Sequence, residues 1–451
     1  MLVEQSLQAG EPGRAAEIIE RAKDDYSSNS AVLYDMDRGM TLHLAGRYDA
    51  SNAVLEQAET EIDHLYTRRI RTEAKAFLVN DTLLPFEGDP YEQVMVNVVK
   101  ALNYALMGQI NEALVEARRI DHRLNLLADQ TADREAYRDD GFARYVTGLL
   151  YEAAGDLNDA FIAYRKAYEG YQGARAWLHV GAPAMLHKDL LRTSEALGFT
   201  TEFEQYRQAF PNAAWMPATE TGQLAQLVVI SYNGRAPHKE DRFVDLPVSM
   251  DALKLVVLTK AYMGRSSQQN RAAESVLYGL NGRVVRVAVP ALVPQKTTVA
   301  HSQVSLTGPG ASVTASTELA QNVTALAEKN LGDQFSRVAV KAVARAAVKF
   351  ALAEGVGRTA QAAAGRDAGP IVGLLASLIA KSVAVGTEEA DKRSWRTLPD
   401  EIQIARLWVP EGTYTMDVRP VDRTGQPRRA VSKQVTLYAG VTTFVTQRVL
   451  P

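Results

Sequence analysis

Four copies of a glycine-centred pattern lie between residues 10 and 167, and they constrain the fold more than any other feature. Each copy has a hydrophobic residue or proline at +2, a small residue at +5, a large residue at +9 (alanine in one copy) and a small or apolar residue at +12. The copies are Gly10, Pro12, Ala15, Ile19, Ala22; Gly46, Tyr48, Ser51, Leu55, Ala58; Gly108, Ile110, Ala113, Ala117, Ile120; and Gly155, Leu157, Ala160, Tyr164, Ala167. Glycine ends a helix in a left-handed conformation, and a small residue lets the next helix approach closely. The pattern therefore predicts helix–turn–helix units.

These units resemble tetratricopeptide (TPR) repeats, whose helix pairs stack into a superhelix with a concave binding face. We expect such a TPR-like solenoid over residues 1–215, with a degenerate repeat and insertions such as residues 83–91. A plain helical bundle is the alternative, because the same amphipathic helices could pack without regular stacking. Only nine residues precede Gly10, so we expect the numbering to start inside a helix and a segment with a signal sequence to be missing.

Beyond residue 215 the chain changes to strand patterns, so the expected fold class is α+β. Strands are expected at 224–232 and 284–289, a hairpin at 299–317, and further strands from 402 to the end. The stretch 237–245 is interpreted as a charged surface loop. We expect 216–318 and 387–451 to form one β-sandwich-like domain, with an Ala/Gly-rich helical pair at 319–386 inserted into it.

Two stretches of that helical pair are candidates for function. In the first, cations recur every fourth residue on an otherwise apolar helix: Arg337, Lys341, Arg345 and Lys349. Such a stripe fits contact with an anionic membrane or an acidic partner. The alternative is a core helix whose one solvated face is basic. The second stretch, 371–385, is apolar but too short to span a bilayer, and it fits a buried helix better than a re-entrant hairpin.

The segment 390–399, ADKRSWRTLP, joins the helices to the last strands. Asp391 and Arg393 are predicted to pair, and Trp395 to fill the junction between helices and sheet, although a ligand site using Trp395 and Arg393 is the alternative. Together with the degenerate repeats, the helical pair and a short β tail, this element resembles a group of functionally uncharacterised bacterial TPR-containing envelope lipoproteins. That resemblance implies a periplasmic or outer-membrane-associated location, but the lipid-bearing cysteine of such proteins is absent.

Composition and motifs exclude several functions. The net charge of −3 argues against a nucleic-acid-binding protein, and a chain without cysteine has no disulfides, thiolate nucleophiles or thiolate metal sites. The seven histidines are scattered without metal-ligand spacing, and no phosphate-binding loop or nucleophile elbow is present. We therefore assign no catalytic, cofactor or metal residue.

The sequence favours a non-enzymatic scaffold or adaptor of the bacterial envelope that binds a protein or peptide in a TPR-like groove. Four tyrosines that precede repeat turns are candidate groove residues: Tyr34, Tyr104, Tyr145 and Tyr151. Two alternatives belong to other classes. One is a peripheral membrane protein that attaches through 335–385, and the other is a hydrolase with its site in the β domain. Partner identity and oligomeric state do not follow from the sequence.

Overall fold

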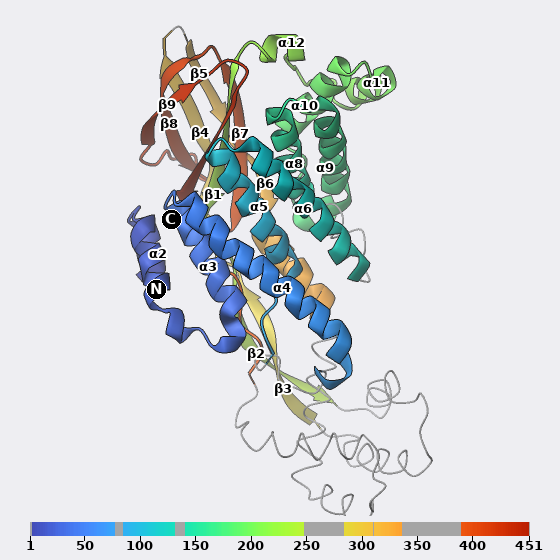
Figure 1. Ribbon diagram of the computed structural model, residues 1–451, viewed down its shortest axis with the longest axis vertical. Coiled ribbons are helices and arrows are strands. Elements are labelled where there is room, and N and C mark those ends of the chain that lie inside the picture. Colours follow the sequence, from blue (N-terminus) through green and yellow to red (C-terminus); the bar gives the residue numbers. More distant parts are fainter. Residues whose placement is uncertain are drawn as a thin grey trace, which may run out of the picture.

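The computed structural model describes residues 2–76, 84–130, 140–247, 284–309, 311–335 and 389–450. It has an α+β architecture: helices cover one face of a sheet whose other face packs on a second sheet (Figure 1). The cationic stripe Arg337, Lys341, Arg345 and Lys349 and the apolar stretch 371–385 lie outside the described residues.

The helices form hairpins, five within the described ranges, each turning at a glycine with positive φ. They are α1 (Leu2–Gln8) with α2 (Pro12–Arg21), α3 (Ala31–Leu44) with α4 (Tyr48–Ala76), α5 (Pro90–Leu106) with α6 (Ile110–Gln130), α8 (Gly141–Ala153) with α9 (Leu157–Leu178), and α10 (Ala184–Ala196) with α11 (Thr200–Ala209). The glycines that the pattern places in left-handed caps have φ values of 72°, 73°, 74° and 82°. The hairpin at Gly198 was missed because its +5 residue is Phe203 instead of a small one.

The small-residue positions do bring the two helices of a hairpin together. Ala15, Ser51, Ala113 and Ala160, at +5 in the four copies, are fully buried. A second close contact lies seven residues before the turn glycine. A Cβ at Gly39 would overlap Leu55, and a Cβ at Gly148 would overlap the ring of Tyr164. The missing side chain of each glycine therefore makes room for the large +9 residue of the next helix.

Two four-stranded sheets hold most of the strands. The inner sheet has the order β10 (Thr442–Val449), β1 (Ala225–Asn233), β7 (Glu401–Val409), β6 (Glu318–Asn322). The outer sheet has the order β5 (Ala311–Ser316), β4 (Val299–Gly308), β8 (Gly412–Asp422), β9 (Val431–Leu437). In the inner sheet β1 runs parallel to β10 and antiparallel to β7. Both sheets thus combine strands from 216–322 with strands from 401–449.

Strand β1 shows why these layers form. All nine of its residues are buried, as expected for a strand with packing on both faces. Val228, Ile230 and Tyr232 belong to the hydrophobic core shared with the helices. The alternate residues Leu227 and Val229 belong to the core between the two sheets. The inner sheet is therefore the middle layer.

Two boundaries differ from the sequence-based expectation. The stretch 237–245 is not a loop but most of β2 (His238–Pro247), which pairs with β3 (Val284–Val293). None of residues 238–244 of β2 is fully buried, and Phe243 is 60% exposed, so this charged strand shows no apolar alternation. The predicted helical start at 319 is also wrong: residues 318–322 pair with β7 as β6, and the helix begins at 323.

We expect Gly148→Ala to destabilise the protein by about 1–3 kcal/mol, because the new methyl group has to displace the buried ring of Tyr164. Gly173→Ala is the matched control. It lies in helix α9, is exposed, and has no atom within 4 Å of its added Cβ. This change should stabilise the protein by about 0.5–1 kcal/mol. Urea denaturation of the two variants measures both effects, and equal stabilisation by both would contradict the close-approach model.

Candidate functional site

The inner helices of the hairpins face the chain's own sheet. Helices α3 and α5 contact β10, and α8 contacts β6. The hydroxyl of Tyr171, on α9, donates a hydrogen bond of 2.7 Å to the carbonyl oxygen of Ala320 in β6. In α8 the residues 141–150 are all buried, and α5 is buried over most of its circumference. These helices pack between the outer helices and the inner sheet, so the side that a TPR array offers to a peptide is covered here.

The four candidate groove tyrosines are not brought together on an open surface. Tyr145 is fully buried, and its hydroxyl donates to Asp189 at 2.9 Å. Tyr34 is 6% exposed and packs edge-on against Tyr26. Tyr104 and Tyr151 are only partly buried against the core and retain solvent access. The prediction that Tyr145 contacts a partner is therefore wrong, because its side chain is part of the hydrophobic core.

A buried four-charge cluster connects the fourth and fifth hairpins to the inner sheet. Arg406, on β7, is fully buried and lies 2.5 Å from Asp189 and 3.1 Å from Glu152. Arg192 lies 2.8 Å from Asp189 and 2.7 Å from Glu152. Both guanidinium groups also lie over the ring of Trp408, at 4.8 Å for Arg406 and 5.8 Å for Arg192. The two acids and two bases neutralise one another.

The electrostatics of this cluster follow from that arrangement. Burial alone would raise the pKa of Glu152, but the two guanidinium groups outweigh it and lower this pKa to about 2. A buried carboxylate that is held ionised in this way is a structural anchor. It has no spare proton for general acid chemistry near neutral pH.

A second cluster joins α4, α5 and α6. The ammonium group of Lys100, on a side chain that is 1% exposed, lies 2.6 Å from Glu59 and 3.2 Å from Glu116 and also pairs with Glu56. Arg119 contacts the same three carboxylates. Because cations already neutralise these carboxylates, they make a poor metal site. Across the described part of the chain, no group of three or more His, Asp or Glu residues is placed to hold a metal ion.

The junction segment packs where the helices meet the sheets. The Arg393 guanidinium pairs with Asp391 at 2.7 Å and donates to the carbonyl oxygens of Asn29 and Leu84. Trp395 is 1% exposed within the core shared by helices and sheet. Its indole N–H donates to Thr397, so the ring fills the junction and is closed to a ligand.

Glu92, in the first turn of α5, is a buried carboxylic acid next to Trp395. Its two oxygens accept hydrogen bonds from the backbone N–H groups of Trp395 and Asp89, both at 2.7 Å. Burial, reinforced by the Asp89 carboxylate, raises the pKa of Glu92 to about 8, although Lys239 opposes the shift. Glu92 thus connects the start of a helix to the junction segment and carries a proton at neutral pH.

The sequence patterns do not indicate Arg406, Glu152 or Glu92 as buried cluster residues. Arg406 has a visible signal, since it is the one charged residue between Ile402 and Val409 in a strand that is otherwise apolar or amidic. Glu92 follows Asp89-Pro90 as a capping box does, which predicts a helix start but not burial. Glu152 has no such signal, because its partners are distant in the sequence.

Comparison with known proteins identifies no relative: no family model and no curated protein matches the chain. Among the helices that the structure describes, none combines the length and the apolar character that a bilayer crossing requires.

We expect Arg406→Met to destabilise the protein by about 3–5 kcal/mol, because it leaves Asp189 and Glu152 with only Arg192 to neutralise them in a buried site. Adding Asp189→Asn should restore part of the loss, since the charges then balance. The control is Arg419→Met, an exposed position on β8. Denaturant unfolding measures all three, and a loss no larger than that of the control would contradict a structural role for the cluster.

Glu92 should make stability depend on pH. Its folded pKa of about 8 lies above the ordinary glutamic acid pKa of 4.5, so the folded state holds the proton more tightly. The stability that this contributes at low pH is lost as pH rises towards 8. In Glu92→Gln this loss should disappear, so the slope of the unfolding free energy against pH should change by up to about 1.4 kcal/mol per pH unit. Unfolding free energies at a series of pH values test this, with exposed Glu220→Gln as the control. An unchanged slope in Glu92→Gln would mean that Glu92 is ionised when folded.

Proposed function

We propose that this chain is a non-enzymatic, protein-binding scaffold or adaptor of the bacterial cell envelope, built on TPR-like helical hairpins. The observation that supports it most is the hydrophobic core that the second to fifth hairpins share with the inner sheet and the junction segment. Such a core fixes the outer surfaces of helices and sheets in one rigid arrangement. The buried charges of the described clusters are meanwhile used in ion pairs, as a structural protein requires.

The TPR-like description rests on the repeated glycine turns and on the order of the helices. The first helices of successive hairpins, α3, α5 and α8, lie on the inner side, and the second helices α4, α6 and α9 lie outside (Figure 1). The inner sheet occupies the place of a bound peptide. A partner therefore has to bind a different surface, and the edge of the array formed by the hairpin turns remains accessible.

Tyr104 and Tyr151 lie at this edge, which we call the turn edge. Each lies four residues before the turn glycine of its hairpin, at the ends of α5 and α8, and each is partly exposed. Tyrosine offers a large apolar ring together with a polar hydroxyl, which suits a protein interface. We therefore place the partner-binding surface at this edge. The envelope location is proposed from the resemblance to bacterial TPR-containing envelope lipoproteins.

The experiment uses the full chain, because residues 1–215 share their core with the sheet and would expose it if cut away. The tagged chain is used to capture partners from the envelope fraction of a bacterium that carries it. A double variant, Tyr104→Ser with Tyr151→Ser, should reduce capture of the same protein at least tenfold, since both rings leave the interface.

The matched control is Tyr438→Ser, which removes a tyrosine that is 60% exposed beyond β9, on the sheets. It should leave capture unchanged. If the double variant and the control capture equally well, the turn edge is not the interface. Failure of the intact chain to retain any envelope protein would contradict the scaffold function itself.

A further inference from the structure

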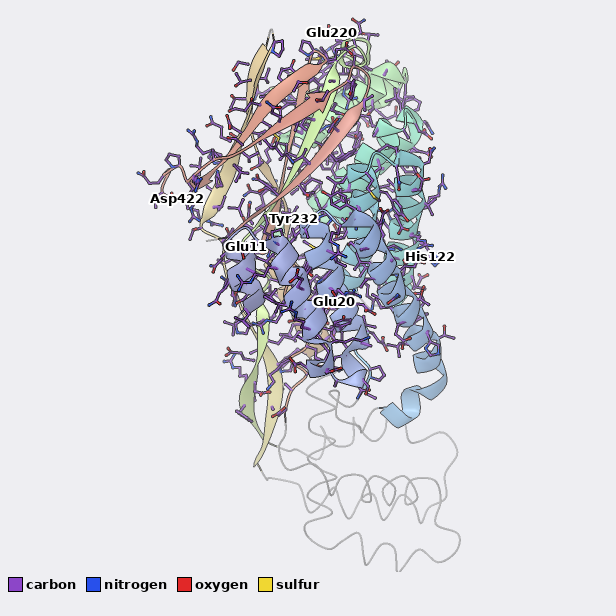
Figure 2. All side chains as sticks on the ribbon, turned by 60° about the vertical axis from the view of Figure 1, so that its left-hand side comes forward. Glu11, Glu20, His122, Glu220, Tyr232 and Asp422 are labelled. Carbon is purple, nitrogen blue, oxygen red and sulfur yellow. The ribbon has the colours of Figure 1, made fainter. Side chains whose placement is uncertain are left out.

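A cavity of about 200 Å³ lies where the amino-terminal hairpin meets the ends of β1 and β10. We call it the arginine pocket, because Arg235, Arg396 and Arg448 contribute to its wall. Figure 2 shows Tyr232, the residue of β1 that pairs with Arg448 in register, at the level where the strands reach the amino-terminal helices. None of the sequence patterns pointed to this place.

Arg448 has hydrogen-bonding capacity that the described protein does not use. One of its terminal nitrogens, Nη2, donates to the carbonyl oxygen of Leu398 at 3.1 Å. Its Nε and Nη1 are buried and have no hydrogen-bond partner among the described residues. Burial and the nearby Arg235 lower the pKa of Arg448 to about 9. A buried donor without an acceptor costs stability, and a bound anion would supply the acceptor that Arg448 lacks.

Two neighbouring groups also lack a hydrogen-bond partner. The Nε of Arg235 and the hydroxyl of Tyr232 are also buried without a hydrogen-bond partner in the described structure. Unused donors from three residues therefore gather at the ends of two parallel strands.

The carboxylates of the pocket leave Arg448 unpaired. Glu4 lies 3.6 Å from Arg235 and 4.0 Å from Arg396, at the rim. Asp37 accepts hydrogen bonds from Tyr26 and Thr397, at 3.0 Å and 2.9 Å. Among the described residues of the pocket, and with both acids ionised, the three arginines leave one positive charge in excess. A monoanion would neutralise the pocket.

The apolar part of the lining is formed by Val3, Leu7, Ile19 and Leu450. We propose that the arginine pocket binds a small amphiphilic monoanion. Its oxyanion, a carboxylate or a phosphodiester, pairs with the guanidinium group of Arg448, and its apolar chain lies along the apolar lining residues. Arginine matches such oxygens because its donors form a planar fork. The proposal is independent of the partner surface at the turn edge.

The test measures thermal unfolding and calorimetric titration of the purified full chain at low ionic strength, where screening is weak. The probes are hexanoate, dibutyl phosphate and, as the neutral counterpart, hexanol. We expect at least one of the two anions to raise the melting temperature by at least about 2 °C at saturation, and hexanol to leave it unchanged. The anion that binds more tightly identifies the source of the oxyanion. If hexanol acts as strongly as the anions, or if no anion binds, the proposal is wrong.

Arg448→Met removes the charge and keeps the length of the side chain. Without ligand this variant should melt at the same temperature as the unmodified chain or higher, because an unpaired buried charge is lost. Its affinity for the anion should fall at least about tenfold. Arg429→Gln, at an exposed loop position, is the control and should bind normally.

A lower melting temperature of Arg448→Met without ligand would assign Arg448 a structural role, and unchanged anion affinity would remove it from the site. Either result overturns the proposal. Arg235→Met is the second variant, which leaves the Arg448 bond to Leu398 in place and should also weaken anion binding. Normal binding by Arg235→Met and Arg448→Met together would place the anion elsewhere.

Discussion

Burial of the inner helices from both sides is the constraint on which the rest of this structure depends. Helices α5 and α8 carry buried residues around most of their circumference, which a helix on the surface of a bundle does not. One side packs on the outer helices and the other on β1, β6, β7 and β10. Neither the helical layer nor the inner sheet can therefore be removed without exposing a large apolar surface of the other.

Charged groups within this apolar interface define how its layers fit together. The four charges of Arg406, Arg192, Glu152 and Asp189 allow little displacement, because a shifted β7 would leave charges unpaired in a buried site. At the other end Glu92 acts through hydrogen bonds instead of charge, because its carboxyl group accepts from the backbone N–H of Trp395. These interactions add little net stability compared with an apolar core, but they disfavour any other register of sheet against helices.

The local features of this fold could be predicted from the sequence, and its long-range features could not. Turn glycines such as Gly46 and Gly155 impose a backbone conformation that depends only on neighbouring residues, so the hairpins follow from the pattern. The tail strands follow from alternation in the same way. The ribbon strand at 238–247 could not be predicted from alternation, because exposed strands pair through the backbone and need no apolar side chains. The sheet's position on the inner helices could not be predicted, and neither could the burial of Tyr145. Both depend on contacts between residues more than 40 positions apart.

The parallel pairing of β1 with β10 has a consequence for how the chain matures on the ribosome. Gln226 pairs with Thr442, so the inner sheet lacks its edge strand β10 until residues 442–449 have left the exit tunnel. The hairpins, whose contacts are local, can form as they emerge. Until the sheet covers them, their apolar inner side is exposed, which makes the incomplete chain prone to aggregation.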